Sequence, residues 1–285
     1  MCNNKRYSVV KNTLLVIAFL LSFKGFAHGD LSIKIQEKTK EILKTPKDFK
    51  LYYQRGLLYQ QHIEYAKALK DYNSSKVLGN TNRVLQYRMA EVNYLAMDYE
   101  LALIKVKLYL ESGEGDVKGK KLEAQILFNL EQYKKALKSY RFVINKMIDL
   151  RPEDIIEYCN IILAENNKNF KGALEAIEIG LNQLGPKTLS LQLKKLEYLE
   201  DSNQTQKVLK QYNYFILEYY RNEFWYFKKA KYLVKINKPE EAKIALKLTA
   251  IAIEQLDEKF KNMNSRRKIQ KEIKKLYNEI NNSEL

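Results

Sequence analysis

The chain has 285 residues, of which 46% are hydrophobic, so it can bury a sizeable core in one large domain or two ordinary ones. The formal net charge of +16 permits a nucleic acid, an anionic membrane or an acidic protein as a partner. The only cysteines are Cys2 and Cys159. If Cys2 is removed with a leader, the single remaining cysteine can form neither an intramolecular disulfide nor a cysteine zinc site.

Residues 1–27 have the three zones of a secretory signal peptide. An apolar run, Thr13–Phe23, follows a positively charged start, and small residues at Gly25 and Ala27 suit a cleavage site. The positive charges are Lys5, Arg6 and Lys11. We expect cleavage after Ala27 or after Gly29 and export to the periplasm or cell surface of a bacterium.

The alternative is an uncleaved anchor in the inner membrane, although the apolar run is shorter than the roughly 20 residues of a spanning helix. Lysine, asparagine and isoleucine are frequent throughout the chain, which indicates a compositional bias rather than a designed basic patch. Nucleic acid would be the natural partner only if the leader were not used, so we expect no nucleic-acid partner for the exported protein.

After the leader, residues 28–48 predict a leading helix and a linker. The helix runs from Asp30 to Thr45 and stops before Pro46, because the residue before a proline is driven away from helical backbone angles. With only 10 glycines and 4 prolines in the chain, we expect the rest to be mostly helical as well.

From residue 49 the sequence repeats with a period of 34 residues. Aromatic and small residues recur together in three successive segments, 49–82, 83–116 and 117–150. The recurring sets are Tyr65, Tyr99 and Tyr133; Ala68, Ala102 and Ala136; and Gly56, Ala90 and Ala124. A 34-residue repeat built from two helices resembles the tetratricopeptide repeat (TPR) family.

This resemblance explains why a helix accepts Gly56, which costs roughly 0.5–1 kcal/mol relative to alanine in a helix interior. In the family, a small residue in each of the two helices lets them pack closely. We assign this packing role to Gly56, Ala68, Ala90, Ala102, Ala124 and Ala136. The first repeat departs from the family pattern at Tyr52 and Arg55, where Trp and Leu are common.

The C-terminal half continues the pattern more loosely. Residues 151–256 predict three degenerate TPR-like repeats, 154–187, 189–222 and 223–256, the first of them with three inserted residues. Residues 257–285 predict a basic C-terminal capping helix, because the end of a solenoid needs a polar outer face. Its positive charges would alternatively contact an anionic membrane or an acidic partner.

The resemblance implies an all-α, right-handed superhelical solenoid of helix-turn-helix repeats with an extended concave surface. The implied function is an exported scaffold or adaptor that binds a protein or peptide, and the alternative is a membrane-tethered module that assembles an envelope complex. The family's concave positions carry over to Tyr53, Leu57, Gln60, Tyr87, Arg88, Glu91, Tyr94, Lys121, Gln125 and Phe128. The family's paired Lys and Asn for a C-terminal carboxylate are replaced by Tyr53 and Leu57, so a chaperone tail is not the expected ligand.

The sequence has no motif that predicts catalysis. It lacks a phosphate-binding loop, a GxSxG and an HExxH pattern. Its two histidines, His28 and His62, have no second His or Cys at metal-ligand spacing. We therefore expect no enzyme, no catalytic residue, no cofactor and no metal, and we expect Cys159 to be a core residue.

Overall fold

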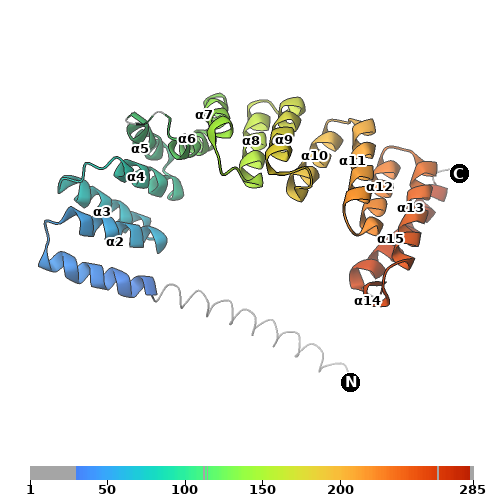
Figure 1. The fold of residues 1–285 in the computed structure, drawn as a ribbon, viewed down its shortest axis with the longest axis horizontal. Coiled ribbons are helices and arrows are strands. Elements are labelled where there is room, and N and C mark those ends of the chain that lie inside the picture. The colour runs from blue at the N-terminus through green and yellow to red at the C-terminus, as the bar shows by residue number, and fades with distance from the viewer. Residues whose placement is uncertain (1–29, 112, 114, 262, 283–285) are drawn as a thin grey trace, which may run out of the picture. The chain divides into compact units, whose positions relative to one another are not determined.

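The computed structural model describes residues 30–282 except 112, 114 and 262. The expected leader, residues 1–27, lies outside this part. All regular structure within the described residues is helical, in successive helix pairs, which confirms the predicted all-α fold (Figure 1). The chain forms two compact units that divide between Met147 and Ile148.

The first unit begins with an unlabelled helix over residues 30–44, which ends before Pro46 as the sequence predicts. Three helix pairs follow, and the helices of each pair pack on one another. They are α2 (Phe49–Gln61) with α3 (Tyr65–Val77), α4 (Val84–Leu95) with α5 (Tyr99–Glu111), and α6 (Val117–Asn129) with α7 (Tyr133–Lys146).

The second unit also contains three helix pairs, followed by two further helices. The pairs are α8 (Pro152–Glu165) with α9 (Phe170–Leu184), α10 (Leu189–Asp201) with α11 (Thr205–Glu218), and α12 (Asn222–Lys235) with α13 (Pro239–Glu254). The last helices are α14 (Glu258–Lys261) and α15 (Asn264–Asn282), so the single C-terminal helix expected from residue 257 is interrupted. Asn264 and Ser265, residue types that favour helix starts, begin the second piece.

Gly56 lies on the side of α2 that packs closely against α3. A Cβ atom added to it would come within 2.6 Å of the Tyr72 ring and 3.4 Å of the Ala68 carbonyl oxygen. Ala68 is itself fully buried. Close packing of the two helices therefore outweighs the low helix propensity of glycine at this position. The equivalent alanines, 90, 102, 124 and 136, are also fully buried.

Five of the six helix pairs share one turn geometry. The second residue after the first helix has a positive φ angle between 54° and 65°, and its N–H and the next N–H bond back to carbonyls of the last helical turn. These residues are Ile63, Met97, Glu131, Asn203 and Asn237. The pattern is a Schellman-type helix end, which satisfies carbonyls that would otherwise lack a donor.

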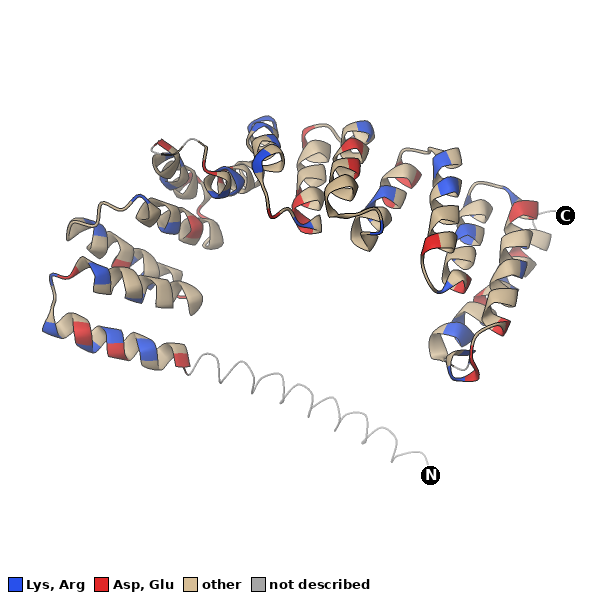
Figure 2. Cartoon of the chain, viewed as in Figure 1, with Lys and Arg blue, Asp and Glu red and all other residues tan. Residues whose placement is uncertain are grey.

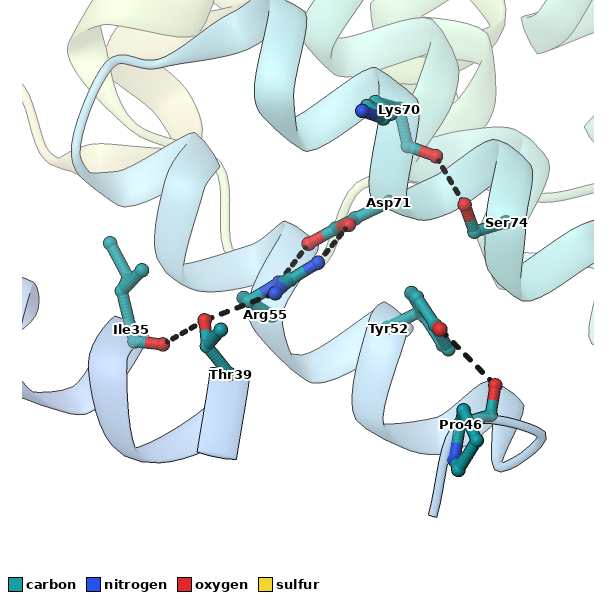
Figure 3. A network of polar contacts seen from close by, with 8 residues as sticks. All are labelled: Ile35, Thr39, Pro46, Tyr52, Arg55, Lys70, Asp71 and Ser74. Atoms are coloured by element: carbon teal, nitrogen blue, oxygen red, sulfur yellow. Dashed lines mark hydrogen bonds and ion pairs between the residues drawn. The ribbon is translucent and has the colours of Figure 1, made fainter. Parts of the chain in front are cut away.

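The leading helix is tied to the first pair through Arg55 (Figure 3). Its guanidinium donates two hydrogen bonds, of 2.7 and 2.8 Å, to the carboxylate of Asp71 on α3. A third bond, of 3.0 Å, reaches the Thr39 hydroxyl on the leading helix. Arg55 thus joins three helices, which explains why an arginine replaces the leucine common at this position in TPR sequences.

Helix α15 covers the last helix pair. Ile269, Ile273 and Ile280 are buried and belong to the same apolar cluster as residues of α12 and α13. Arg266 does not contribute to a solvated basic face, because it is buried and donates a 2.9 Å bond to the buried carboxylate of Glu223. The other basic residues of α15 are exposed and lie on the remaining surface of the helix.

Candidate functional site

The first helices of the first unit hold a polar network that crosses from one helix pair to the next. Gln60 on α2 donates a 2.7 Å hydrogen bond to Glu91 on α4, and the Gln60 side-chain oxygen accepts one of 2.7 Å from the Tyr72 hydroxyl on α3. Arg88 donates to the same Glu91 oxygen, also over 2.7 Å. Three helices therefore fix the orientation of Gln60 and Glu91.

Arg88 lies at the centre of this network and is half-buried. Burial lowers the pKa of its guanidinium, but the hydrogen bond and charge of Glu91, together with a hydrogen bond to Tyr53, outweigh burial and raise that pKa overall. Its Nε atom is buried and forms no hydrogen bond in the described part of the chain. Arg88 is therefore a permanent positive charge that is held by Glu91 and Tyr53 beside the aromatic side chains of this face.

Aromatic side chains continue the face beyond the polar network. Tyr94 on α4 packs against Tyr99 with ring centroids 5.8 Å apart, and Phe128 on α6 packs edge-to-face against Tyr133 at 5.6 Å. Both rings are half-buried, so one side is packed and part of the ring remains accessible. Rings held in this way lose little further conformational freedom when a partner binds them.

The other predicted residues of the face differ in exposure. Tyr53, Leu57, Lys121 and Gln125 are half-buried, and the Tyr53 ring lies 5.8 Å from that of Tyr72. Tyr87 is only 7% exposed. It packs edge-to-face on Tyr109 at 5.2 Å within a core cluster of the second and third helix pairs, so it has little surface left for a partner.

Two partners of this region were missed by reasoning from the sequence. The hydrogen bond by which the Tyr72 hydroxyl orients Gln60 was not predicted. Asp71 was not singled out, although it holds Arg55. An available signal was the departure of Arg55 from the family pattern, because a half-buried arginine requires a nearby carboxylate.

The described residues include one histidine, His62, and one cysteine, Cys159. Within the residues that the structure describes, no three side chains of His, Cys, Asp or Glu gather at metal-binding distance. Cys159 is fully buried, which agrees with the predicted core role, and burial raises its pKa to about 12.

Comparison with known proteins gives the fold but no closer relative. No family model and no curated protein matches the chain. Among solved structures, the C-terminal part of a TPR repeat-containing protein from Cytophaga hutchinsonii is similar, with a TM-score of 0.63 and 15% identity over 81% of this chain and 93% of that one.

Two further solved structures agree. A tetratricopeptide repeat protein from Parabacteroides merdae has a TM-score of 0.53 and 13% identity, over 88% of this chain and 93% of that one. YrrB, described as a TPR protein with an unusual peptide-binding site, has a TM-score of 0.50 and 18% identity, over 63% and 90%. The chain therefore has the fold of tetratricopeptide repeat proteins.

Proposed function

We propose that this protein is a scaffold or adaptor that binds another protein through the first helices of its N-terminal unit. The observation that carries the proposal is the oriented network of Gln60, Glu91 and Arg88 beside the accessible rings of Tyr94 and Phe128. Tyrosine and arginine are the residue types most often found as binding hot spots. The proposal includes no catalytic step, cofactor or metal.

An extended peptide or a partner helix fits this face. The amide of Gln60 and the charges of Arg88 and Glu91 provide hydrogen bonds in fixed directions, while the rings provide apolar anchors. The likeness to YrrB supports a peptide ligand, because that protein is described as having an unusual peptide-binding site. Tyr53 and Leu57 supply no positive charge for a C-terminal carboxylate, which favours an internal segment of the partner.

The test is crosslinking in the native host followed by affinity purification and mass spectrometry. Arg88→Ala, Tyr94→Ala and Phe128→Ala should each weaken capture of the partner by on the order of 2 kcal/mol, if each is a hot spot. Each variant is first checked for an unchanged helical spectrum and melting temperature. Lys138→Ala, at an exposed position of α7, is the matched control.

The outcome that contradicts this proposal is specific. If all three variants fold and retain the partner, while charge-reversing substitutions on the exposed side of α15 abolish its capture, the binding surface is the basic C-terminal helix. Lys268 and Lys271, both exposed, are the positions for that comparison.

The proposal also places the scaffold outside the cytoplasm. This part of the proposal depends only on the residue pattern of the leader. Mass spectrometry of protein from the native host should find a chain that begins at His28 or Asp30. A chain that retains residue 1 and sediments with the inner membrane supports the tethered alternative, and a soluble cytoplasmic chain that retains it contradicts both. No helix in the described part of the chain has the length and apolar character to cross a membrane.

A further inference from the structure

A cavity of about 750 Å³ lies in the second unit between α9, α10 and α11. This volume falls within the range of roughly 300–1,000 Å³ that is usual for ligand sites. The cavity is separate from the face described above. On α10 it is lined by Gln192, Lys195 and Leu199, whereas the positions equivalent to Tyr53, Leu57 and Gln60 in this repeat are Leu193, Glu197 and Glu200.

The wall of the cavity combines apolar side chains with a buried pair of amides. Leu174 and Leu199 supply the apolar surface. The Gln211 amide nitrogen donates a 2.6 Å hydrogen bond to the side-chain oxygen of Gln192. The amide nitrogen of Gln192 donates another of 2.6 Å to the Pro186 carbonyl. The Gln211 side chain is therefore held in place.

One polar atom of this pair is left over. Gln211 is only 6% exposed, and its side-chain oxygen accepts no hydrogen bond from any residue that the structure describes. This oxygen is free to accept a hydrogen bond from an N–H group of a ligand in the cavity.

The rim of the cavity is positively charged. Four lysines and two glutamates line it, and one lysine, Lys195, is neutralised by Glu178 at 2.6 Å. Lys171, Lys207 and Lys210 are exposed and form no ion pair within the described residues. Lys207 and Lys210 lie in the first half of α11, which carries blue segments in Figure 2. The remaining glutamate offsets only one of these three charges.

We propose that this cavity binds an acidic peptide segment of a partner protein. Carboxylates of the segment would pair with Lys171, Lys207 and Lys210, an apolar side chain between them would contact Leu174 and Leu199, and a backbone N–H would bond to the Gln211 oxygen. A peptide supplies all three chemical groups at short spacing. This site is additional to the first-helix face and does not depend on it.

The test uses fluorescein-labelled heptapeptides in which glutamates flank a central Leu, Ile, Phe or Trp, and a second set with glutamine in place of glutamate. Fluorescence anisotropy with the purified chain should show binding of the glutamate set that weakens as salt is raised. Lys207→Glu/Lys210→Glu should weaken this binding by about tenfold or more, since it reverses two charges at the rim. The double variant Lys235→Glu/Lys247→Glu changes the net charge equally at exposed sites outside the cavity and should retain the affinity.

Each remaining outcome decides the question. Equal binding of the two peptide sets, or an equal loss in both double variants, overturns the proposal. Displacement of the peptides by free glutamate at similar concentration assigns the cavity to a small acid instead. A loss that occurs only in Tyr94→Ala/Phe128→Ala places acidic peptides on the first-helix face, and so overturns this site while supporting the proposed function. If Lys207→Glu/Lys210→Glu does not fold, Lys207→Gln/Lys210→Gln is used in its place.

Discussion

The two units are built from the same helix pairs but are held together differently. In the first unit the three turns within pairs have the same backbone geometry at Ile63, Met97 and Glu131, each 34 residues from the next. In the second unit the α8–α9 connection is longer and Asn166, which follows α8, has an extended backbone with φ of −147°. The second unit therefore departs from the strict period at its first pair.

In the second unit, a stacked aromatic pair and a buried ion pair join neighbouring helices. Phe215 and Trp225 stack with centroids 4.0 Å apart and planes 9° from parallel, and they join α11 to α12. The Arg266–Glu223 ion pair then joins α15 to α12. The comparison shows that a loosened period is compatible with the fold when other contacts fix neighbouring helices.

The largest effect is expected from that ion pair. Glu223→Ala leaves Arg266 charged, buried and without its carboxylate, which typically costs about 3–5 kcal/mol. Denaturant unfolding measures the loss, and hydrogen exchange should increase in α12, α13 and α15. The double variant Glu223→Gln/Arg266→Met removes both charges and should recover most of the stability. If the single and double variants are equally unstable, the loss is one of packing and not of charge.

A smaller effect is expected from overpacking the strictly periodic unit. Ala102→Leu and Ala136→Leu force volume into fully buried positions between paired helices and should each destabilise by about 1–3 kcal/mol. Thermal melts of both variants, with Lys138→Ala as an exposed control, provide the measurement. Melting temperatures equal to the control would show that these alanines do not set the helix spacing.

Exchanging the turn residues Ile63 and Asn203 should change the free energy of unfolding by about 1 kcal/mol, with opposite signs in the two units. Ile63 is a β-branched residue with φ of 65°, whereas Asn203 occupies the equivalent turn with φ of 54°. Because asparagine tolerates left-handed backbone angles better, Ile63→Asn should stabilise and Asn203→Ile should destabilise. Both residues are exposed, so little packing changes. Shifts of the same sign would contradict the shared geometry.

At neutral pH no change in stability is expected from ionisation of Cys159. Burial raises its folded pKa from an ordinary 9.0 to about 12, so the stabilisation from the buried neutral thiol is complete below pH 9 and is lost as the pH rises towards 12. Iodoacetamide at pH 8.5 should label the Cys159 peptide only after unfolding in guanidinium, as mass spectrometry would show. Rapid labelling of the native chain would mean that the α8–α9 pair opens readily.

The sequence predicted the helices and their pairing well, because small and aromatic residues recur at a fixed spacing. It did not predict the turn geometry, since Ile63, Met97 and Glu131 share no side-chain chemistry and the backbone alone makes them equivalent. It predicted a polar outer face for the basic residues of 257–285 and did not distinguish Arg266 from them, because only the fold brings Glu223 beside Arg266, 43 positions away in the chain.

For the candidate site, family positions identified the side chains but not their partners. Tyr87 and Tyr94 are both aromatic residues of one helix, yet only the tertiary structure distinguishes the buried ring from the partly accessible one. The cavity of the second unit left no pattern in the sequence, because its lysines and amides come from three helices and resemble ordinary solvated positions.

The turns at Ile63, Met97 and Glu131 have a consequence for the length of the chain. Since each ends a helix in the same backbone conformation, 34 residues is the natural increment by which this part can be lengthened or shortened. Deleting residues 83–116 would place the third helix pair directly after the first and keep every remaining turn intact. A deletion one residue shorter or longer would shift a whole helix by about 100° around its axis and turn buried alanines towards water. The backbone of the first half therefore tolerates insertion or deletion of whole 34-residue repeats.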